Sequence, residues 1–326
     1  MNKEIQPRYA SRTLLALVAV ILAACNHAGV STSPSNVHQA VTATNAVIRS
    51  SRIPPNPDGP TVARQMQERY DDKSPDCSTA IRPAFLCAGV LFRGTTASTA
   101  YHSWNPNPSS KRGSVSFAWL RQDANFGSMH YTNGFVFLPK LHADEFGYRP
   151  MFVLCAFPLD GGTESRSEKG CGKRPGDTPH SRPCATQNIT TAAAWLTAYR
   201  VKPYDYDNQC SFNVTYGTPD TANAFSQVYL AMASLNGELF NPPAHWNGTN
   251  ELLIETWPQD IPRELPIEAF FYTGTKTGLD GARYDQKDFY GATGRWVPVI
   301  RLTLATTMCG RATFAYNPAD QLIAGP

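Results

Sequence analysis

The sequence predicts an α+β protein built on a mainly antiparallel sheet core with two amphipathic helices. Runs of strand length, rich in β-branched and aromatic residues and mostly bounded by Pro or Gly, recur along the chain. Two segments between them place apolar residues at spacings of three and four, which is the helical period. The order is strands, then helices, then strands, and this segregation favours α+β over an alternating parallel sheet. No internal repeat of solenoid or propeller length occurs.

The strand-like runs fall into an early, a middle and a late group. The first run, 85–92, is followed by Arg93 and then by Gly94, which predicts an arginine at the end of a buried strand. The complete set of expected strands is 85–92, 114–121, 133–139, 151–158, 210–216, 251–257, 266–273, 296–304 and 312–316.

The two expected helices have recognisable ends. Asn188 or Thr190 can cap the first, which stops before Pro203. Asp220 caps the second, which ends before Gly237. Two further segments are rich in Gly and polar residues and are expected to be loops, 159–187 and 274–294.

The amino terminus has the layout of an export signal. A basic segment precedes an apolar stretch, 14–22, that is short for a membrane span. It ends in Leu-Ala-Ala-Cys, which resembles a bacterial lipobox, so residues 1–24 are predicted to be removed and Cys25 to carry a lipid anchor. Ordinary signal cleavage, with Cys25 incidental, is the alternative. Asn26 favours the outer membrane by resemblance to sorted lipoproteins, so we expect an exported protein, either an outer-membrane lipoprotein or a secreted one.

The mature chain is expected to consist of a flexible tether, 25–76, and one folded domain, 77–326. The tether is rich in Ser, Thr, Asn and Pro and buries too little apolar surface to fold, apart from one short helix near 61–70. Loss of the signal removes three basic residues and one acidic residue, which lowers the formal charge from +3 to +1. That charge predicts no nucleic-acid partner, and it leaves the lipid anchor or signal as the means of membrane contact.

Seven cysteines follow Cys25, and an oxidising compartment favours disulfides over metal ligation. Spacing suggests three pairs and leaves Cys309 free, unless Cys25 is not lipidated, although spacing alone does not determine connectivity. The three suggested pairs are Cys77 with Cys87, Cys155 with Cys210, and Cys171 with Cys184. No CxxC motif occurs, and no metal site is expected.

The signatures of several enzyme classes are missing. The chain contains no GxSxG, no GxxxxGK[ST], no HExxH and no GxGxxG opening a helix. The seven histidines are scattered rather than placed at ligand spacing. These absences argue against a hydrolase of the nucleophile-elbow type, a phosphate-loop enzyme and a zinc protease.

Three short motifs nevertheless fall in an order shared with a known superfamily. Arg93 closes the first strand, Ser114 and Ser116 form a Ser-x-Ser at the start of the second, and Gln286 and Asp288 form a late Gln-x-acid. This order resembles the arginine, serine and glutamate triad of the ADP-ribosyltransferase superfamily. With the runs 101–106, 114–121 and 285–289, the chain looks like the halovibrins, exported bacterial proteins associated with NAD hydrolysis and ADP-ribosylation. The likeness spans about residues 77–321.

The resemblance implies an ADP-ribosyltransferase-like fold and a site for NAD as substrate, with no further cofactor. Cleaving the bond between nicotinamide and ribose passes through a transition state that resembles an oxocarbenium ion. Arg93 would bind the diphosphate with its planar fork of donors, and Ser116 would brace the ribose or the acidic residue. Gln286 or Asp288 would hold the ribose hydroxyls. Hydrogen bonds within a turn are the alternative role for that last pair.

Residues between the first two strands are expected to contact the substrate. Tyr101, His102 and Trp104 could stack on nicotinamide or adenine, and Ser114, which opens the second strand, is a further expected substrate contact. Core packing is the alternative for the aromatic side chains. Because Asp288 is one methylene shorter than the family's glutamate, we favour hydrolysis over transfer to a host or competitor protein. The alternative function is a non-catalytic envelope lipoprotein that binds a partner or glycan.

Overall fold

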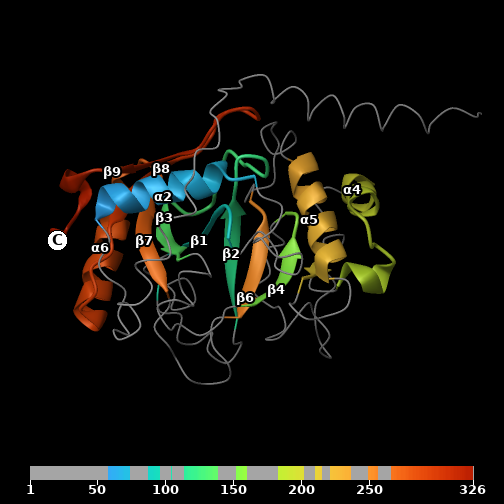
Figure 1. Ribbon diagram of the computed structural model, residues 1–326, viewed down its shortest axis with the longest axis horizontal. Helices are drawn as coiled ribbons and strands as arrows, with labels where there is room; N and C mark the ends of the chain where they lie inside the picture. Colours follow the sequence, from blue (N-terminus) through green and yellow to red (C-terminus); the bar gives the residue numbers. More distant parts are fainter. Residues whose placement is uncertain are drawn as a thin grey trace, which may run out of the picture. The chain divides into compact units, whose positions relative to one another are not determined.

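A nine-stranded sheet forms the centre of the computed structural model, in the order β5-β4-β6-β2-β1-β3-β7-β8-β9 (Figure 1). Every neighbouring pair is antiparallel except β7 and β8. The predicted α+β class with a mainly antiparallel sheet is therefore confirmed. The structure describes residues 58–73, 87–95, 104, 114–138, 152–159, 183–201, 210–214, 221–235, 249–255 and 266–325. All of them belong to one unit of the chain, Asn45–Pro326.

The elements follow the predicted order closely. The strands are β1 (Val90–Gly94), β2 (Ser114–Leu120), β3 (Asn133–Phe137), β4 (Phe152–Phe157), β5 (Phe212–Asn213), β6 (Glu251–Glu255), β7 (Ile267–Tyr272), β8 (Val299–Thr303) and β9 (Thr313–Tyr316). The helices are α2 (Gly59–Asp71), α4 (Ala192–Val201), α5 (Thr221–Leu235) and α6 (Lys276–Thr293), with the short 3-10 helices η6 (Cys184–Gln187) and η8 (Pro318–Asp320). The described residues thus contain four α-helices, whereas the sequence predicts two amphipathic helices and one short helix near 61–70.

The sheet divides between its two central strands. β1 and β2 pair through three residues and their ladder ends with Phe92 opposite Ala118. Beyond that point β1 stays paired with β3 through Gly94, opposite Gly134, while the first part of β2 pairs with β6. The residues at the end of β1 and the start of β2 therefore lie where two halves of the sheet part.

The loop expected over 274–294 is wrong, because this segment is the 18-residue helix α6. Thr275 caps it by accepting a hydrogen bond from the Gly278 amide at 3.0 Å, and Gly294 ends it in the left-handed conformation. Its buried face includes Ala282, Gln286 and Phe289, which recur at helical spacing. Glycines inside the segment lower its helix propensity, and packing on the sheet overcomes that cost.

The short helix expected near 61–70 is confirmed as α2, but it belongs to the folded unit rather than to a tether. Val62, Met66 and Tyr70 are fully buried in the core. The side-chain amide of Gln67 also bonds to the backbone at the edge strand β9: it donates to the carbonyl of Ala312, just before the strand, and accepts from the amide of Phe314. These contacts bury apolar surface and satisfy part of an open sheet edge, so the folded region begins before residue 77.

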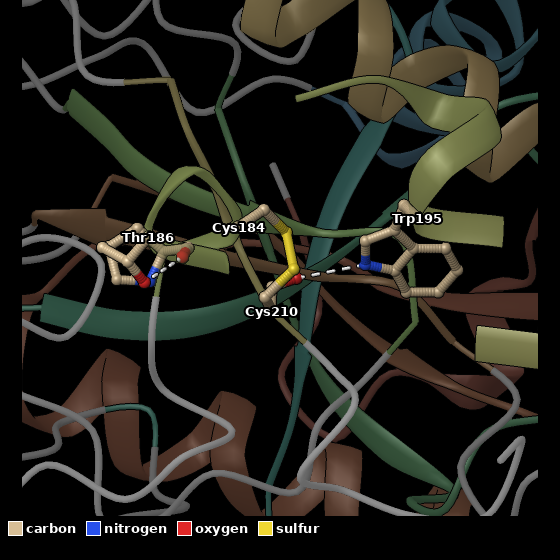
Figure 2. The surroundings of a disulfide bond; sticks show 5 residues. Cys184, Thr186, Trp195 and Cys210 are labelled. Atoms are coloured by element: carbon tan, nitrogen blue, oxygen red, sulfur yellow. Dashed lines mark hydrogen bonds between the residues drawn. A yellow bond between two sulfur atoms is a disulfide. The ribbon is translucent and has the colours of Figure 1, made fainter. Parts of the chain in front are cut away.

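The disulfides differ from two of the three expected pairs. Cys184 is bonded to Cys210, with their Cα atoms 4.7 Å apart (Figure 2), so the pairings of Cys171 with Cys184 and Cys155 with Cys210 are wrong. Cys309 is also disulfide-bonded, which contradicts its expected free thiol. Spacing along the chain misled here because a disulfide depends on Cα separation in the fold, where the bridge between Pro183 and Ser211 aligns the two segments.

The remaining cysteines lie partly outside the described residues. Cys87 and Cys155 are disulfide-bonded. Cys25, Cys77 and Cys171 fall outside the residues that the structure describes, so the pairing of Cys77 with Cys87 and the lipidation of Cys25 stay predictions. No helix in the described ranges combines the length and apolar character needed to cross a membrane.

Candidate functional site

Arg93 lies at the point where the central strands part. It is only 5% exposed, although it precedes the last residue of β1. Its Nη1 atom donates a hydrogen bond to the Ser116 carbonyl oxygen at 2.6 Å. The guanidinium therefore continues the contact between β1 and β2 after their backbone ladder has ended, and this holds its planar fork in a fixed place.

The side chain of Ser116, unlike its carbonyl, bonds to a buried carboxylate. Its Oγ donates a hydrogen bond to Oε1 of Glu251, the first residue of β6. Glu251 is 5% exposed. Ser116 is paired with Leu253, so Glu251, two residues before Leu253, lies on the same face of the sheet as Ser116. A serine and a glutamate from neighbouring strands are thus directly joined.

Asn250 fixes the register of that glutamate. Its side-chain oxygen accepts from the Trp119 amide at 2.8 Å, and its side-chain nitrogen donates to the Trp119 carbonyl at 2.8 Å. The amide side chain therefore takes the place of one more ladder residue between β2 and β6. Because both atoms of the Asn250 amide are used, Glu251 is held at a defined distance from the Ser116 hydroxyl.

Three adjacent strands therefore supply a guanidinium, bonded to the backbone of Ser116, and a carboxylate, bonded to the hydroxyl of the same serine. We call Arg93, Ser116 and Glu251 the strand triad. Sequence reasoning identified Arg93 and Ser116 but missed Glu251, which it placed at the start of an ordinary strand. The available signal was an acidic residue opening the apolar run Leu-Leu-Ile, since burying a carboxylate is costly unless it is paired.

Gln286 does not join Arg93 and Ser116 through any contact among the described residues. It is fully buried on α6, and its Nε2 donates to the Val297 carbonyl at 2.8 Å and to the Gln321 side chain at 3.1 Å. Its oxygen accepts from the Leu322 and Ile323 amides. All of these hydrogen bonds join α6 to residues 297 and 321–323, so Gln286 stabilises the packing of the carboxyl-terminal segment on α6.

Asp288 and Trp104 meet each other rather than the strand triad. The indole Nε1 of Trp104 donates to Oδ2 of Asp288 at 2.9 Å. The Trp104 ring also packs edge-on against Phe289, with centroids 5.1 Å apart. The late Gln-x-acid of the sequence therefore faces two ways, with Gln286 toward the carboxyl-terminal segment and Asp288 toward the chain that follows β1.

The neighbouring carboxylate, Asp285, is bonded to the end of β1. Its Oδ2 accepts from the Thr95 hydroxyl at 2.8 Å and from the Asn133 amide at 3.4 Å. Burial raises the pKa of Asp285 to about 6, against the opposing effect of those two hydrogen bonds, and the nearby Asp288 carboxylate raises it further.

The other expected substrate contacts are only partly described. Ser114 is the first residue of β2, as predicted. Tyr101 and His102 lie outside the described residues. Within the ranges that the structure describes, no group of three or more His, Cys, Asp or Glu side chains could hold a metal ion.

Comparison with known proteins adds no family assignment. No protein-family profile matches the chain, and no curated protein sequence is significantly similar to it.

Proposed function

We propose that this protein is an exported NAD glycohydrolase with an ADP-ribosyltransferase-like fold. The strand triad is the observation that carries the proposal, because it links through Ser116 a guanidinium, a hydroxyl and a carboxylate, three groups that cleavage of the nicotinamide–ribose bond can use. Arg93 supplies a fixed cation for the diphosphate, and Ser116 supplies a hydroxyl that orients a carboxylate. Glu251 supplies the carboxylate itself.

In this mechanism Glu251 replaces Gln286 and Asp288 as the group that holds the ribose. A carboxylate that accepts from the ribose hydroxyls stabilises positive charge on the sugar as the bond from C1′ to the nicotinamide nitrogen breaks. The hydrogen bond from Ser116 orients Glu251 beforehand, so little reorganisation is needed at the moment of cleavage. Water then adds at C1′, giving ADP-ribose, nicotinamide and a proton.

The presence of a glutamate rather than a shorter aspartate at this place reopens protein modification as a variant of the same reaction. We propose hydrolysis as the main activity, with mono-ADP-ribosyl transfer to a host or competitor protein where an acceptor side chain takes the place of water. We further propose export through the signal over 1–24 and attachment through Cys25, or release as a secreted protein. The disulfide between Cys184 and Cys210 favours an oxidising compartment.

The first test is nicotinamide release from NAD by the purified mature protein. The wild type is expected to release nicotinamide, and Glu251→Gln to lose at least ~10²-fold in kcat, the scale seen when a preorganised electrostatic group is removed. Glu268→Gln is the matched control, because Glu268 is also a buried strand glutamate and is paired with Arg69 rather than with the strand triad. It is expected to keep wild-type kcat per folded molecule.

Two results would count against the proposal. A folded wild type that releases no nicotinamide would overturn the activity and leave a non-catalytic envelope lipoprotein as the better interpretation. An active wild type whose Glu251→Gln variant keeps full kcat would overturn the assignment of the strand triad. Circular dichroism of each variant separates loss of turnover from loss of folded protein.

A further inference from the structure

Helix α6 is bonded to the chain immediately after β1, two residues from Arg93. Thr95 is buried and its amide donates to the Asn133 carbonyl at 3.0 Å, which continues the pairing of β1 with β3. Its hydroxyl donates to Asp285 and accepts from the Asn133 side chain at 2.9 Å. Three polar side chains from β3, α6 and the end of β1 thus form one closed network.

The same helix holds the chain a second time, nine residues farther on. Trp104 bonds to Asp288 through its indole nitrogen and packs on Phe289. Asp285 and Asp288 are three residues apart and therefore neighbours on the helix surface. One helix accordingly fastens both Thr95 and Trp104, which bracket the start of the connection between β1 and β2.

The local packing of α6 makes the first of these links possible. A Cβ atom added at Gly281 would lie 2.8 Å from the amide atoms of Asn133, so a side chain there would push the helix away from β3. Two further contacts fix α6: Gln286 bonds to the carboxyl-terminal segment, and Phe289 packs against Phe270. The helix is therefore a fixed support from which Asp285 reaches Thr95.

A carboxylate is an expensive choice for that link. Burial disfavours its charged form at neutral pH, whereas an asparagine at the same place could accept the Thr95 hydrogen bond without carrying a charge. Groups that cost stability are retained more readily beside functional sites than elsewhere. Here the nearby site is Arg93, whose backbone is continuous with Thr95.

We propose that Asp285 is a positioning residue for the strand triad, acting through Thr95 to hold the end of β1 and so the guanidinium of Arg93, while Asp288 and Trp104 secure the chain that follows. This inference rests on the proposed NAD cleavage for its kinetic readout. A displaced guanidinium would bind the diphosphate less well and would align the scissile bond less well, so both KM and kcat would change.

The experiment is a double-mutant cycle on Thr95 and Asp285, measured as kcat/KM for nicotinamide release. Asp285→Ala and Thr95→Val are each expected to lower kcat/KM about 10-fold, the effect of a modest misplacement of a binding group. The double variant should be no worse than either single one, because both remove the same link. Asp285→Asn should stay within about 3-fold of the wild type, since its amide oxygen can still accept from Thr95.

Asp320→Asn is the matched control for general destabilisation. Asp320 is another buried aspartate that accepts a hydroxyl hydrogen bond, from Tyr272 at 2.7 Å, and no described contact joins it to Thr95. It is expected to leave kcat/KM unchanged, whatever its effect on thermal stability. Additive losses in the cycle, wild-type kcat/KM in Asp285→Ala, or an equal loss in Asp320→Asn would overturn the positioning role.

A structural readout keeps this inference separate from the proposed function. If the wild type releases no nicotinamide, the function fails, and the positioning role is judged from hydrogen–deuterium exchange at the Thr95 amide. Faster exchange in Asp285→Ala and Thr95→Val, with no change in Asp320→Asn, supports the link to the end of β1. Unchanged exchange in Asp285→Ala overturns it.

Discussion

The charge of Asp285, near the strand triad, makes the stability of the protein depend on pH. Asp285 is ionised in the unfolded chain above its ordinary pKa of 3.8, whereas in the folded protein its pKa is raised to about 6. Between these values the folded state binds the extra proton, so the free energy of unfolding contributed by this group falls as the pH rises from about 4 to about 6. At neutral pH the buried charge therefore destabilises the fold.

Asp285→Asn is accordingly expected to stabilise the protein at pH 7.5. A shift of about two pKa units corresponds to at most about 3 kcal/mol, and we expect roughly 1–3 kcal/mol because Asp285 is only partly buried. The gain should disappear below about pH 4, where Asp285 is protonated in both states. Urea denaturation of both proteins at pH 3.5, 5.5 and 7.5 measures this difference, and a gain that is constant across the series would contradict the assignment of the raised pKa to Asp285.

Site residues could be identified from the sequence where their position depends only on the strand that contains them. Arg93 and Ser116 are identifiable because each sits at an end of an apolar run, and strand ends can be located from periodicity. Glu251 joins them only because β6, far along the chain, pairs with β2 in one register. Such a pairing depends on the packing of the whole sheet. The acidic start of the run Leu-Leu-Ile is a local signal for a paired carboxylate, but it does not indicate that the partner is Ser116.

At the level of elements, the prediction of strands succeeded and the prediction of one helix failed. The strand runs carry β-branched and aromatic residues and have clear boundaries, and all nine expected runs contain a strand. In α6 the glycines and charged residues are more numerous than the apolar residues of its buried face, so the sequence of this segment predicts a loop. Its helical state depends on contacts with β3 and β7 that a sequence window does not contain.

The close pairing of β1 with β3 gives an element-scale prediction. A Cβ atom at Gly134 would lie 1.8 Å from the Arg93 carbonyl oxygen, which is backbone and cannot swing away. Gly134→Ala is therefore expected to move β1 at Arg93, to cost about 1–3 kcal/mol of stability and to lower nicotinamide release. Differential scanning calorimetry and the release assay measure the two effects.

Gly291→Ala is the control for this substitution. A Cβ atom at Gly291 meets no other atom within 4 Å, and the residue lies on the exposed surface of α6. Alanine there should raise stability by up to about 1 kcal/mol through helix propensity and leave turnover unchanged. Wild-type stability and activity in Gly134→Ala would show that β3 does not fix the position of Arg93.

At the scale of the whole molecule, the sheet connects the strand triad to the helices α4 and α5. α4 packs on α5, α5 contacts β5, and β5 continues through β4 to β6, which bears Glu251 (Figure 1). The disulfide between Cys184 and Cys210 fastens the segment before α4 to the start of β5. A disturbance of α4 or α5 can therefore reach Glu251 through β5 and β4.

Removal of that disulfide tests how much the covalent bond stabilises the part of the protein formed by α4, α5 and β5. The bond closes a separation of 26 residues, so Cys184→Ser together with Cys210→Ser is expected to lower the free energy of unfolding by roughly 3 kcal/mol on the chain-entropy view. Trp195 reports the local change, because its indole donates to the Cys210 carbonyl at 3.2 Å (Figure 2). Its fluorescence should shift to the red as water reaches the ring. Unchanged urea midpoints with an unshifted spectrum would mean that hydrogen bonding and packing around η6 hold this end without the covalent link.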